Sequence, residues 1–276
     1  MPTITATSAS PQAEIYYQDC NPTGAQTVVL IHGWPLSHRM WEPQVNALTE
    51  AGYRVIAYDR RGFGGSAKPW GGYTYDTFAA DLHDLLTALD LRAVTLVGFS
   101  MGGGEVARYC GRYGTDRLAR VAFVSSVAPF MLKTDDNPDG VPQETFDEMM
   151  AGVKADRPAF LKGFSEQFVN WGLLSHPTSE PLLDYSRWLA WQAQPHATQE
   201  CITAFGTTDF RPDMAAISVP ALFVHGTGDQ IVPIEVSARQ GHAMVRGSRL
   251  EEIADAPRGL THAEAFNRIL MDFLGA

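Results

Sequence analysis

The sequence is poor in the features that mark secreted, membrane-spanning and metal-binding proteins. Its 276 residues include three cysteines, Cys20, Cys110 and Cys201, which lie far apart and form no Cys-x-x-Cys pair. This spacing indicates neither a disulfide framework nor a zinc knuckle and is typical of a reducing compartment. No run approaches the roughly 18 apolar residues of a membrane span, and Met1–Ser10 lacks the basic and apolar regions of a signal peptide. We therefore expect a cytoplasmic protein with no membrane partner.

Positive charge is scarce as well. Lysine and arginine number 21 against 31 aspartates and glutamates, so the formal net charge is −10. The sequence has no basic stretch that could neutralise a phosphate backbone, and nucleic acid is therefore not an expected partner. Apolar residues make up 45% of the chain, which is ample for a core. We expect one domain with an insertion, and we leave open whether it forms a homo-oligomer.

Short apolar runs rich in β-branched residues alternate with longer stretches of helical periodicity. This alternation predicts an α/β fold, in which a mostly parallel central sheet carries helices on both faces. The predicted strands are Thr27–Ile31, Arg54–Tyr58, Val94–Val97, Val121–Val124 and Ala221–Val224. The predicted helices include Phe78–Leu89, Glu105–Tyr113 and Ala263–Leu274.

The alternation breaks between Pro129 and Pro212. This region is rich in apolar and aromatic residues at helical spacing and contains no convincing strand. Its large apolar side chains are Phe146, Met149, Met150, Phe160, Phe164, Phe168, Trp171, Trp188 and Trp191. We expect a helical lid at residues 129–212, inserted into a core domain formed by residues 1–128 and 213–276.

The strongest functional signal is Gly98-Phe99-Ser100-Met101-Gly102, which directly follows a predicted strand and precedes a predicted helix. Gly-x-Ser-x-Gly in this setting is a nucleophile elbow, a strained turn that exposes the serine and that only small flanking residues permit. The alternative is a glycine-rich turn that contains a serine by chance, and the strand–turn–helix setting argues against it. Ser100 is therefore the predicted nucleophile.

A serine nucleophile needs hydrogen-bond donors for the oxyanion that its attack creates. In an elbow one donor is the N–H of the following residue, here Met101, and the other comes from the loop after an earlier strand. That loop reads His32-Gly33-Trp34-Pro35, and the N–H of Trp34 is the candidate. His32 itself is better interpreted as a structural turn residue.

Asp229 is the candidate acid. It lies beside Gly228, just past the predicted strand Ala221–Val224. A carboxylate at the carboxyl end of a parallel strand reaches the edge of the sheet and can hold an imidazole in the required tautomer. The alternative is a solvated turn aspartate.

These motifs resemble those of the α/β-hydrolase superfamily, in particular its cofactor-independent haloperoxidase, esterase and lactamase branch. The resemblance extends over nearly the whole chain and rests on the segments His32–Pro35, Asp59–Ser66, Gly98–Gly103, Asn137–Gly140 and Gly228–Pro233. It implies a serine esterase that also makes peracids from carboxylic acids and hydrogen peroxide, with no cofactor, metal or haem. It also implies that Ser100 is the nucleophile, Asp229 the acid, and Trp34 and Met101 the oxyanion donors.

One element departs from the pattern of this branch. Its catalytic histidine usually stands in an Ala-Pro-His-Gly loop, and here Arg258 takes the place of that histidine. A guanidinium stays protonated near neutrality and cannot act as a general base. Among the eight histidines, His262 follows Asp229 in the terminal loop, so it is the candidate base. An arginine beside Ser100 would instead bind a carboxylate ligand through paired hydrogen bonds.

The motifs together favour a serine hydrolase that acts on an ester, lactone or amide carbonyl, with perhydrolase side activity. Arg258 keeps two alternatives open: a catalytically impaired or repurposed ligand-binding protein, and a cofactor-free lyase or oxygenase. The apolar lid favours a small uncharged acyl or aryl substrate, with Phe99 and Arg258 as candidate substrate contacts.

A second glycine-rich motif suggests a different function. Gly62–Ala67 matches the Gly-x-Gly-x-x-Ala pattern of dinucleotide sites, and Asp81 follows about 20 residues further on, where such sites carry an acidic residue. Lys68-Pro69 comes directly after the motif, so the glycines do not open a helix that could hold a pyrophosphate. We interpret the segment as a structural loop near the active-site edge.

Overall fold

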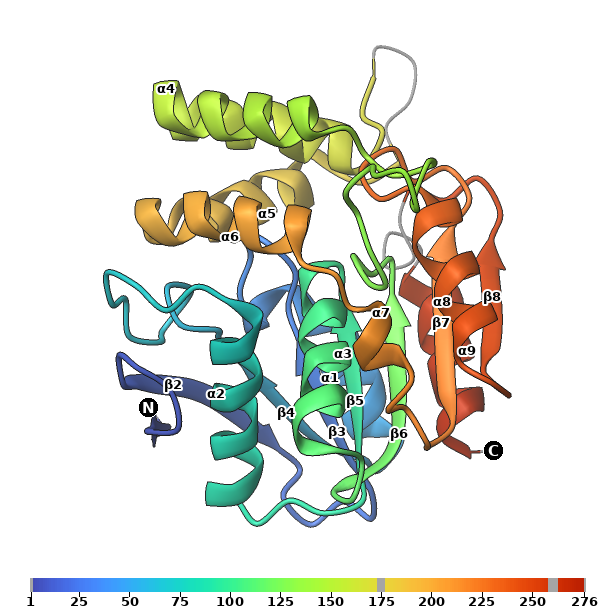
Figure 1. The fold of residues 1–276 in the computed structure, drawn as a ribbon. Coiled ribbons are helices and arrows are strands. Elements are labelled where there is room, and N and C mark those ends of the chain that lie inside the picture. Colours follow the sequence, from blue (N-terminus) through green and yellow to red (C-terminus); the bar gives the residue numbers. More distant parts are fainter. Residues whose placement is uncertain (1, 173–176, 258–262, 276) are drawn as a thin grey trace.

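The protein is built on one central sheet with helices on both sides (Figure 1). The computed structural model describes residues 2–172, 177–257 and 263–275. The strands lie in the order β1-β2-β4-β3-β5-β6-β7-β8. The pairs β1–β2 and β2–β4 are antiparallel, and the remaining pairs are parallel. The strand bounds are β1 Thr3–Ala6, β2 Ala13–Cys20, β3 Thr27–Ile31, β4 Arg54–Tyr58, β5 Val94–Phe99, β6 Leu118–Val124, β7 Ala221–Gly226 and β8 Arg249–Ile253.

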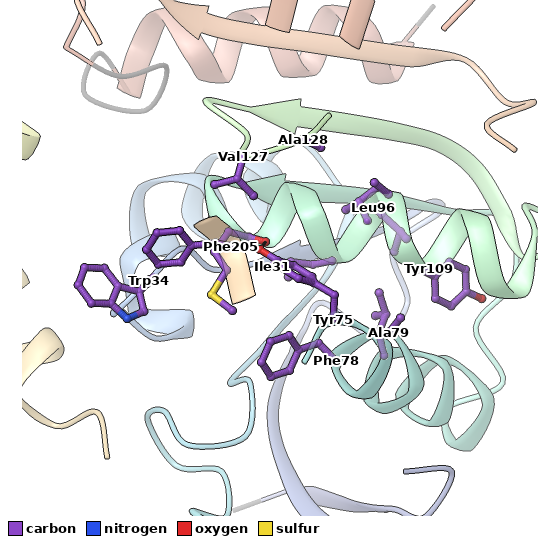
Figure 2. Packing of buried hydrophobic residues seen from close by; sticks show 14 of the residues in the cluster. Ile31, Trp34, Tyr75, Phe78, Ala79, Leu96, Tyr109, Val127, Ala128 and Phe205 are labelled. Atoms are coloured by element: carbon purple, nitrogen blue, oxygen red, sulfur yellow. Dashed lines mark hydrogen bonds between the residues drawn. The ribbon is translucent and has the colours of Figure 1, made fainter. Parts of the chain in front are cut away.

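Two apolar clusters enclose the sheet, because successive residues of a strand face opposite sides. In β3, Val29 and Ile31 join the cluster that α2 and α3 cover, whereas Val28 and Leu30 join the cluster beneath α1 and α9. Figure 2 shows part of the first cluster, with side chains of α2 and α3 packed near Leu96 of β5. The helix bounds outside the insertion are η1 His38–Trp41, α1 Glu42–Glu50, α2 Tyr75–Ala88, α3 Met101–Tyr113, η2 Ile234–Val236, α8 Ala238–Met244 and α9 Ala263–Gly275.

The predicted fold class is confirmed, and the five predicted strands are present as β3, β4, β5, β6 and β7. Three strands, β1, β2 and β8, are not predicted from the sequence because they lie at or beside the edges of the sheet and carry polar residues. In β8, Arg249 forms an ion pair with Asp272, and Glu252 forms one with Arg239. Charged side chains on an edge strand hide the apolar pattern that identifies the central strands.

The insertion consists mainly of helices α4 Gln143–Phe168, α5 Glu180–Trp191, α6 Pro195–Thr207 and α7 Arg211–Met214. α4, α5 and α6 lie together beyond the ends of the central strands, at the top of Figure 1. α4 is kinked at Asp156 (φ −153°, ψ 89°), two residues before Pro158. The Asp156 carboxylate accepts a hydrogen bond from the N–H of Ala159 at 3.0 Å and so caps the second half of the helix.

The described part of residues 129–212 contains no strand, and its extended pairing takes the form of isolated bridges such as Leu132–Val141 and Thr134–Asn137. The region is therefore helical, as its periodicity predicts. Across the described ranges, no helix is long and apolar enough to cross a membrane.

Candidate functional site

Ser100 stands at a sharp turn between β5 and α3. Its backbone has φ 52° and ψ −117°, a conformation that residues with a side chain rarely adopt. The flanking glycines are required because of the close approach of the chain. A Cβ atom at Gly98 would lie 2.4 Å from the Gly102 carbonyl oxygen, and one at Gly102 would lie 2.4 Å from the Ile31 carbonyl oxygen. The Gly-x-Ser-x-Gly spacing therefore reflects contacts of the elbow with itself and with β3.

Backbone hydrogen bonds hold the elbow in this strained form. The N–H of Ser100 donates to the carbonyl oxygen of Val124 at 2.8 Å. The carbonyl oxygen of Ser100 accepts hydrogen bonds from the N–H groups of Gly103 (3.0 Å) and Val127 (3.2 Å). The strain is thus offset by the surrounding structure, and the half-buried Ser100 side chain lines a cavity.

The two candidate oxyanion donors lie on either side of this turn. Met101 is the first residue of α3, so its N–H is one of those at the helix start that have no intrahelical partner. The loop after β3 packs directly against the elbow, because a Cβ atom at Gly33 would lie 3.2 Å from the Cβ of Ser100. Trp34 follows Gly33 and lines the same cavity as Ser100. The structure therefore brings Ser100, Met101 and Trp34 together.

His32 holds the loop that carries Trp34. Its ring is fully buried, with Nδ1 2.9 Å from the Gly33 carbonyl oxygen, while Nε2 accepts a hydrogen bond from the N–H of Arg60 at 3.0 Å. Burial, followed by the nearby charge of Arg60, lowers the pKa of His32 to about 3. A neutral imidazole with a hydrogen bond at each nitrogen has a structural role, which agrees with the interpretation from the sequence.

Asp229 follows β7, two strands away from β5 in the sheet. Its side chain is buried, and Oδ1 accepts hydrogen bonds from the N–H groups of Ile231 (3.0 Å) and Val232 (2.9 Å). Nε2 of His225 lies 3.4 Å from Oδ2 of Asp229 and 2.9 Å from the Val232 carbonyl oxygen. Ile231 and Val232 also line the cavity of Ser100, so the Asp229 loop reaches the same site.

The contact of His225 with Asp229 is not predicted from the sequence, and the structure places His225 near the end of β7. The signal that could have identified it is their spacing of four residues around a glycine-bearing turn. The candidate base His262 and the candidate substrate contact Arg258 lie outside the described residues. Phe99 is buried with its ring 5.9 Å from that of Phe168, and it lines a neighbouring cavity rather than that of Ser100.

The cavity over Ser100, called here the Ser100 cavity, has a volume of about 50 Å³ and mainly apolar walls. Its lining is Trp34, Ser100, Val127, Met131, Val141, Thr145, Phe146, Met149, Phe164, Phe168, Phe205, Ile231 and Val232. The Trp34 ring lies 5.2 Å from Phe164 and 5.6 Å from Phe205, and the latter pair is visible in Figure 2. The aromatic residues of the insertion therefore fall into two groups. Several line the cavity, whereas Trp188 and Trp191 are 51% and 42% exposed.

The second glycine-rich motif has a structural role. Asp81, the residue that would bind a ribose in a dinucleotide site, instead pairs with the Arg61 guanidinium through two hydrogen bonds of 2.6 Å. A Cβ atom at Gly64 would lie 2.1 Å from the Asp59 carboxylate, which accepts the N–H of Gly65 at 2.7 Å. The glycines of this loop therefore make room for a buried carboxylate and not for a phosphate. Within the described ranges, no cluster of three or more histidine, cysteine or acidic side chains could hold a metal ion.

Comparison with known proteins agrees with this geometry. Residues 26–259 match the family model described as alpha/beta hydrolase fold. The chain is 43% identical over 265 residues to the non-heme chloroperoxidase CPO-A1 of Kitasatospora aureofaciens, covering 95% of this chain and 96% of that protein. It is 35% identical over 269 residues to the bifunctional esterase/perhydrolase DCH of Acinetobacter calcoaceticus, with the same coverage. The crystal structure of a bromoperoxidase from Bacillus anthracis matches with a TM-score of 0.93 and 48% identity, covering 100% of both chains.

The chain therefore belongs to the α/β-hydrolase fold family and, within it, to the non-heme haloperoxidase and esterase/perhydrolase group of serine hydrolases. The resemblance inferred from the motifs is confirmed, and so are the predicted class of enzyme and the family to which its function belongs.

Proposed function

We propose that the protein hydrolyses an ester, lactone or amide through an acyl-enzyme formed on Ser100. The observation that carries this proposal is the position of Ser100 in a strained elbow, at the base of an apolar cavity and beside the N–H groups of Met101 and Trp34. Ser100 Oγ attacks the carbonyl carbon and its proton passes to a base. The carbonyl oxygen becomes an oxyanion that the two N–H groups stabilise. The leaving alcohol or amine takes the proton from the base as the acyl-enzyme forms.

In the second half of this reaction, water attacks the acyl carbon and the carboxylic acid is released. Hydrogen peroxide in place of water would give a peracid by the same step, because it also carries a proton that the base can remove. The naming of one relative as a bifunctional esterase/perhydrolase supports this side activity. The chemistry needs no cofactor. The walls of the Ser100 cavity support a small uncharged acyl or aryl group as the reacting end of the substrate.

For the remaining roles we propose Asp229 as the acid that orients the base, and His262 as that base. The buried carboxylate of Asp229 and its two backbone donors support the first assignment. Arg258 supports a second candidate function, a binding protein in which a disabled site holds a carboxylate ligand, because an arginine cannot take the proton of Ser100. A cofactor-free lyase or oxygenase would use the same cavity.

We also propose that residues 129–212 act as a lid on a core formed by residues 1–128 and 213–276. The support is that Phe146, Phe164, Phe168 and Phe205, all from the insertion, wall the cavity above Ser100. These side chains exclude water from the acyl-enzyme and set the shape of the acyl group that fits.

Pre-steady-state hydrolysis of 4-nitrophenyl acetate tests the proposal. We expect a burst of nitrophenol equal to the enzyme concentration, because the acyl-enzyme forms faster than it is resolved. The burst should be absent in Ser100→Ala. Loss of the burst in His262→Ala supports His262 as base, whereas a burst that appears only in Arg258→His supports the binding protein. Turnover that Ser100→Ala leaves unchanged would refute the proposed function.

A further inference from the structure

A larger cavity lies beside the Ser100 cavity, between the helices of the insertion and the segment that runs from Trp34 into α1. It is called here the side chamber and has a volume of about 600 Å³. Its apolar walls in the described part of the chain include Leu36, Leu161, Val169, Leu183, Leu189 and Ala190. Three further residues, Trp34, Phe164 and Phe168, line both cavities. The side chamber and the Ser100 cavity therefore adjoin each other at these three aromatic side chains.

The Ser100 cavity is small for a whole substrate. Its volume of about 50 Å³ is several times smaller than that of a typical small-molecule site. The side chamber, at about 600 Å³, falls within the ~300–1,000 Å³ of typical small-molecule sites. An ester that places its carbonyl group at Ser100 must extend one of its arms elsewhere, and the side chamber is the adjoining space.

The chemistry of the chamber selects an apolar arm. Among its described lining residues the charged side chains are Arg39 and Glu42, and both are exposed at the surface. Most of the remaining described lining is apolar, although Gln44 and Ser165 also belong to it. The Phe164 ring of this lining lies 5.2 Å from Trp34 and 6.2 Å from Phe168. A charged arm would lose hydration against these apolar side chains, whereas an aliphatic arm would not.

We propose that the side chamber binds the extended aliphatic arm of the substrate, so that the substrates of this protein are esters carrying a medium-length alkyl or acyl chain. This inference rests on the proposed function for the position of the reacting carbonyl group. The arm belongs either to the acyl group or to the alcohol, and both offer the same chemistry to the chamber. Each methylene buried there raises kcat/KM by roughly fourfold, the factor that ~0.8 kcal/mol per buried methylene corresponds to.

The test compares two substrate series: 4-nitrophenyl esters from acetate to octanoate, and alkyl acetates from ethyl to octyl. We expect kcat/KM to rise with chain length in at least one series. Ala190→Phe fills the chamber from α5, since Ala190 is buried in its wall. It should lower the ratio of kcat/KM for the longest to the shortest member by about tenfold or more. Ala159→Phe is the matched control, because Ala159 is exposed on α4 and does not line the chamber.

Two further measurements separate an effect on the side chamber from misfolding and from an effect on catalysis. Ser186→Phe places the same ring at a half-buried position of the chamber wall, so the same loss is expected if Ala190→Phe does not fold. Titration calorimetry with 1-octanol reports binding without turnover: we expect binding to the wild type and to Ser100→Ala, and weaker binding to Ala190→Phe. Octanol that binds to Ala190→Phe as to the wild type, or chain-length profiles that are flat in both series, would overturn the inference. Hydrolysis that persists in Ser100→Ala would instead refute the proposed function, and octanol binding would still support the chamber.

Discussion

A single nitrogen of His225 reaches both the Asp229 carboxylate and the loop that follows it. Nε2 lies 3.4 Å from Oδ2 of Asp229 and 2.9 Å from the carbonyl oxygen of Val232. Because the carbonyl oxygen can only accept, Nε2 carries the proton. The other carboxylate oxygen, Oδ1, accepts the N–H groups of Ile231 and Val232. The orientation of Asp229 is therefore fixed by its own loop and by the end of β7.

The first prediction concerns this carboxylate. Asp229→Asn keeps the size of the side chain but removes the charge that orients and stabilises the protonated base. We expect kcat for a short activated ester to fall by about 10³- to 10⁴-fold, as for the equivalent change in other serine hydrolases, while the protein stays folded. Asp139→Asn, at an exposed position of the insertion, is the control. Wild-type activity in Asp229→Asn would show that Asp229 is a loop residue and not the acid.

The second prediction concerns His225 as a positioning residue. His225→Phe removes the N–H that donates to the Val232 carbonyl oxygen beside Asp229, while keeping an aromatic ring in the buried site. We expect kcat to fall by about tenfold, equivalent to the ~1.4 kcal/mol of one hydrogen bond. The pH profile of kcat should also shift, because the base is held less firmly. His225→Gln restores a donor and should recover part of the loss, whereas equal losses in both variants would argue for packing alone.

A third prediction tests the glycines of the elbow. A Cβ atom at Gly102 would lie 2.4 Å from the Ile31 carbonyl oxygen, so Gly102→Ala forces β3 and α3 apart. We expect this variant to lose roughly 1–3 kcal/mol in the free energy of unfolding and most of its activity. At Gly163 in α4, an added Cβ atom would meet nothing within 4 Å. Gly163→Ala should therefore stabilise the protein by about 0.5–1 kcal/mol. Urea denaturation of both variants measures the contrast.

The fourth prediction follows from the pKa of about 3 of the buried His32. In the unfolded chain a histidine has a pKa of about 6.5. Between these two values the unfolded state binds a proton that the folded state does not. Stability is therefore lost as the pH falls below about 6.5, at up to ~1.4 kcal/mol per pH unit. The free energy of unfolding between about pH 6 and pH 4 should fall less steeply in His32→Gln than in the wild type.

His196→Gln, at a half-buried position, controls for the loss of a histidine. Parallel slopes for the wild type and His32→Gln would contradict the buried, neutral state of His32.

The central part of the fold and the elbow are predictable from the sequence because their patterns are local. Five buried strands show as apolar runs, and Ser100 is marked by two glycines that steric contacts require. The edge strand β8 is not predictable in this way, because the charged residues Arg249 and Glu252 interrupt its apolar pattern.

The parts of the site that depend on tertiary contacts also cannot be predicted from a sequence pattern. The contact of His225 with Asp229 depends on how the turn after β7 folds back, and the pairing of Arg61 with Asp81 depends on the packing of α2. The insertion is rich in aromatic residues that look alike in the sequence. In the structure Phe164 lines a cavity, whereas Trp188 is exposed to solvent. Composition shows that a helix has apolar residues, whereas the packing of that helix decides which of them line the site.

Covalent labelling with a fluorophosphonate tests whether Ser100 is the nucleophile. We expect one adduct per chain, located on Ser100 by mass spectrometry of the digested protein, and no adduct in Ser100→Ala. Labelling that persists in Ser100→Ala, or a wild-type protein that takes up no label while it hydrolyses esters, would contradict the claim.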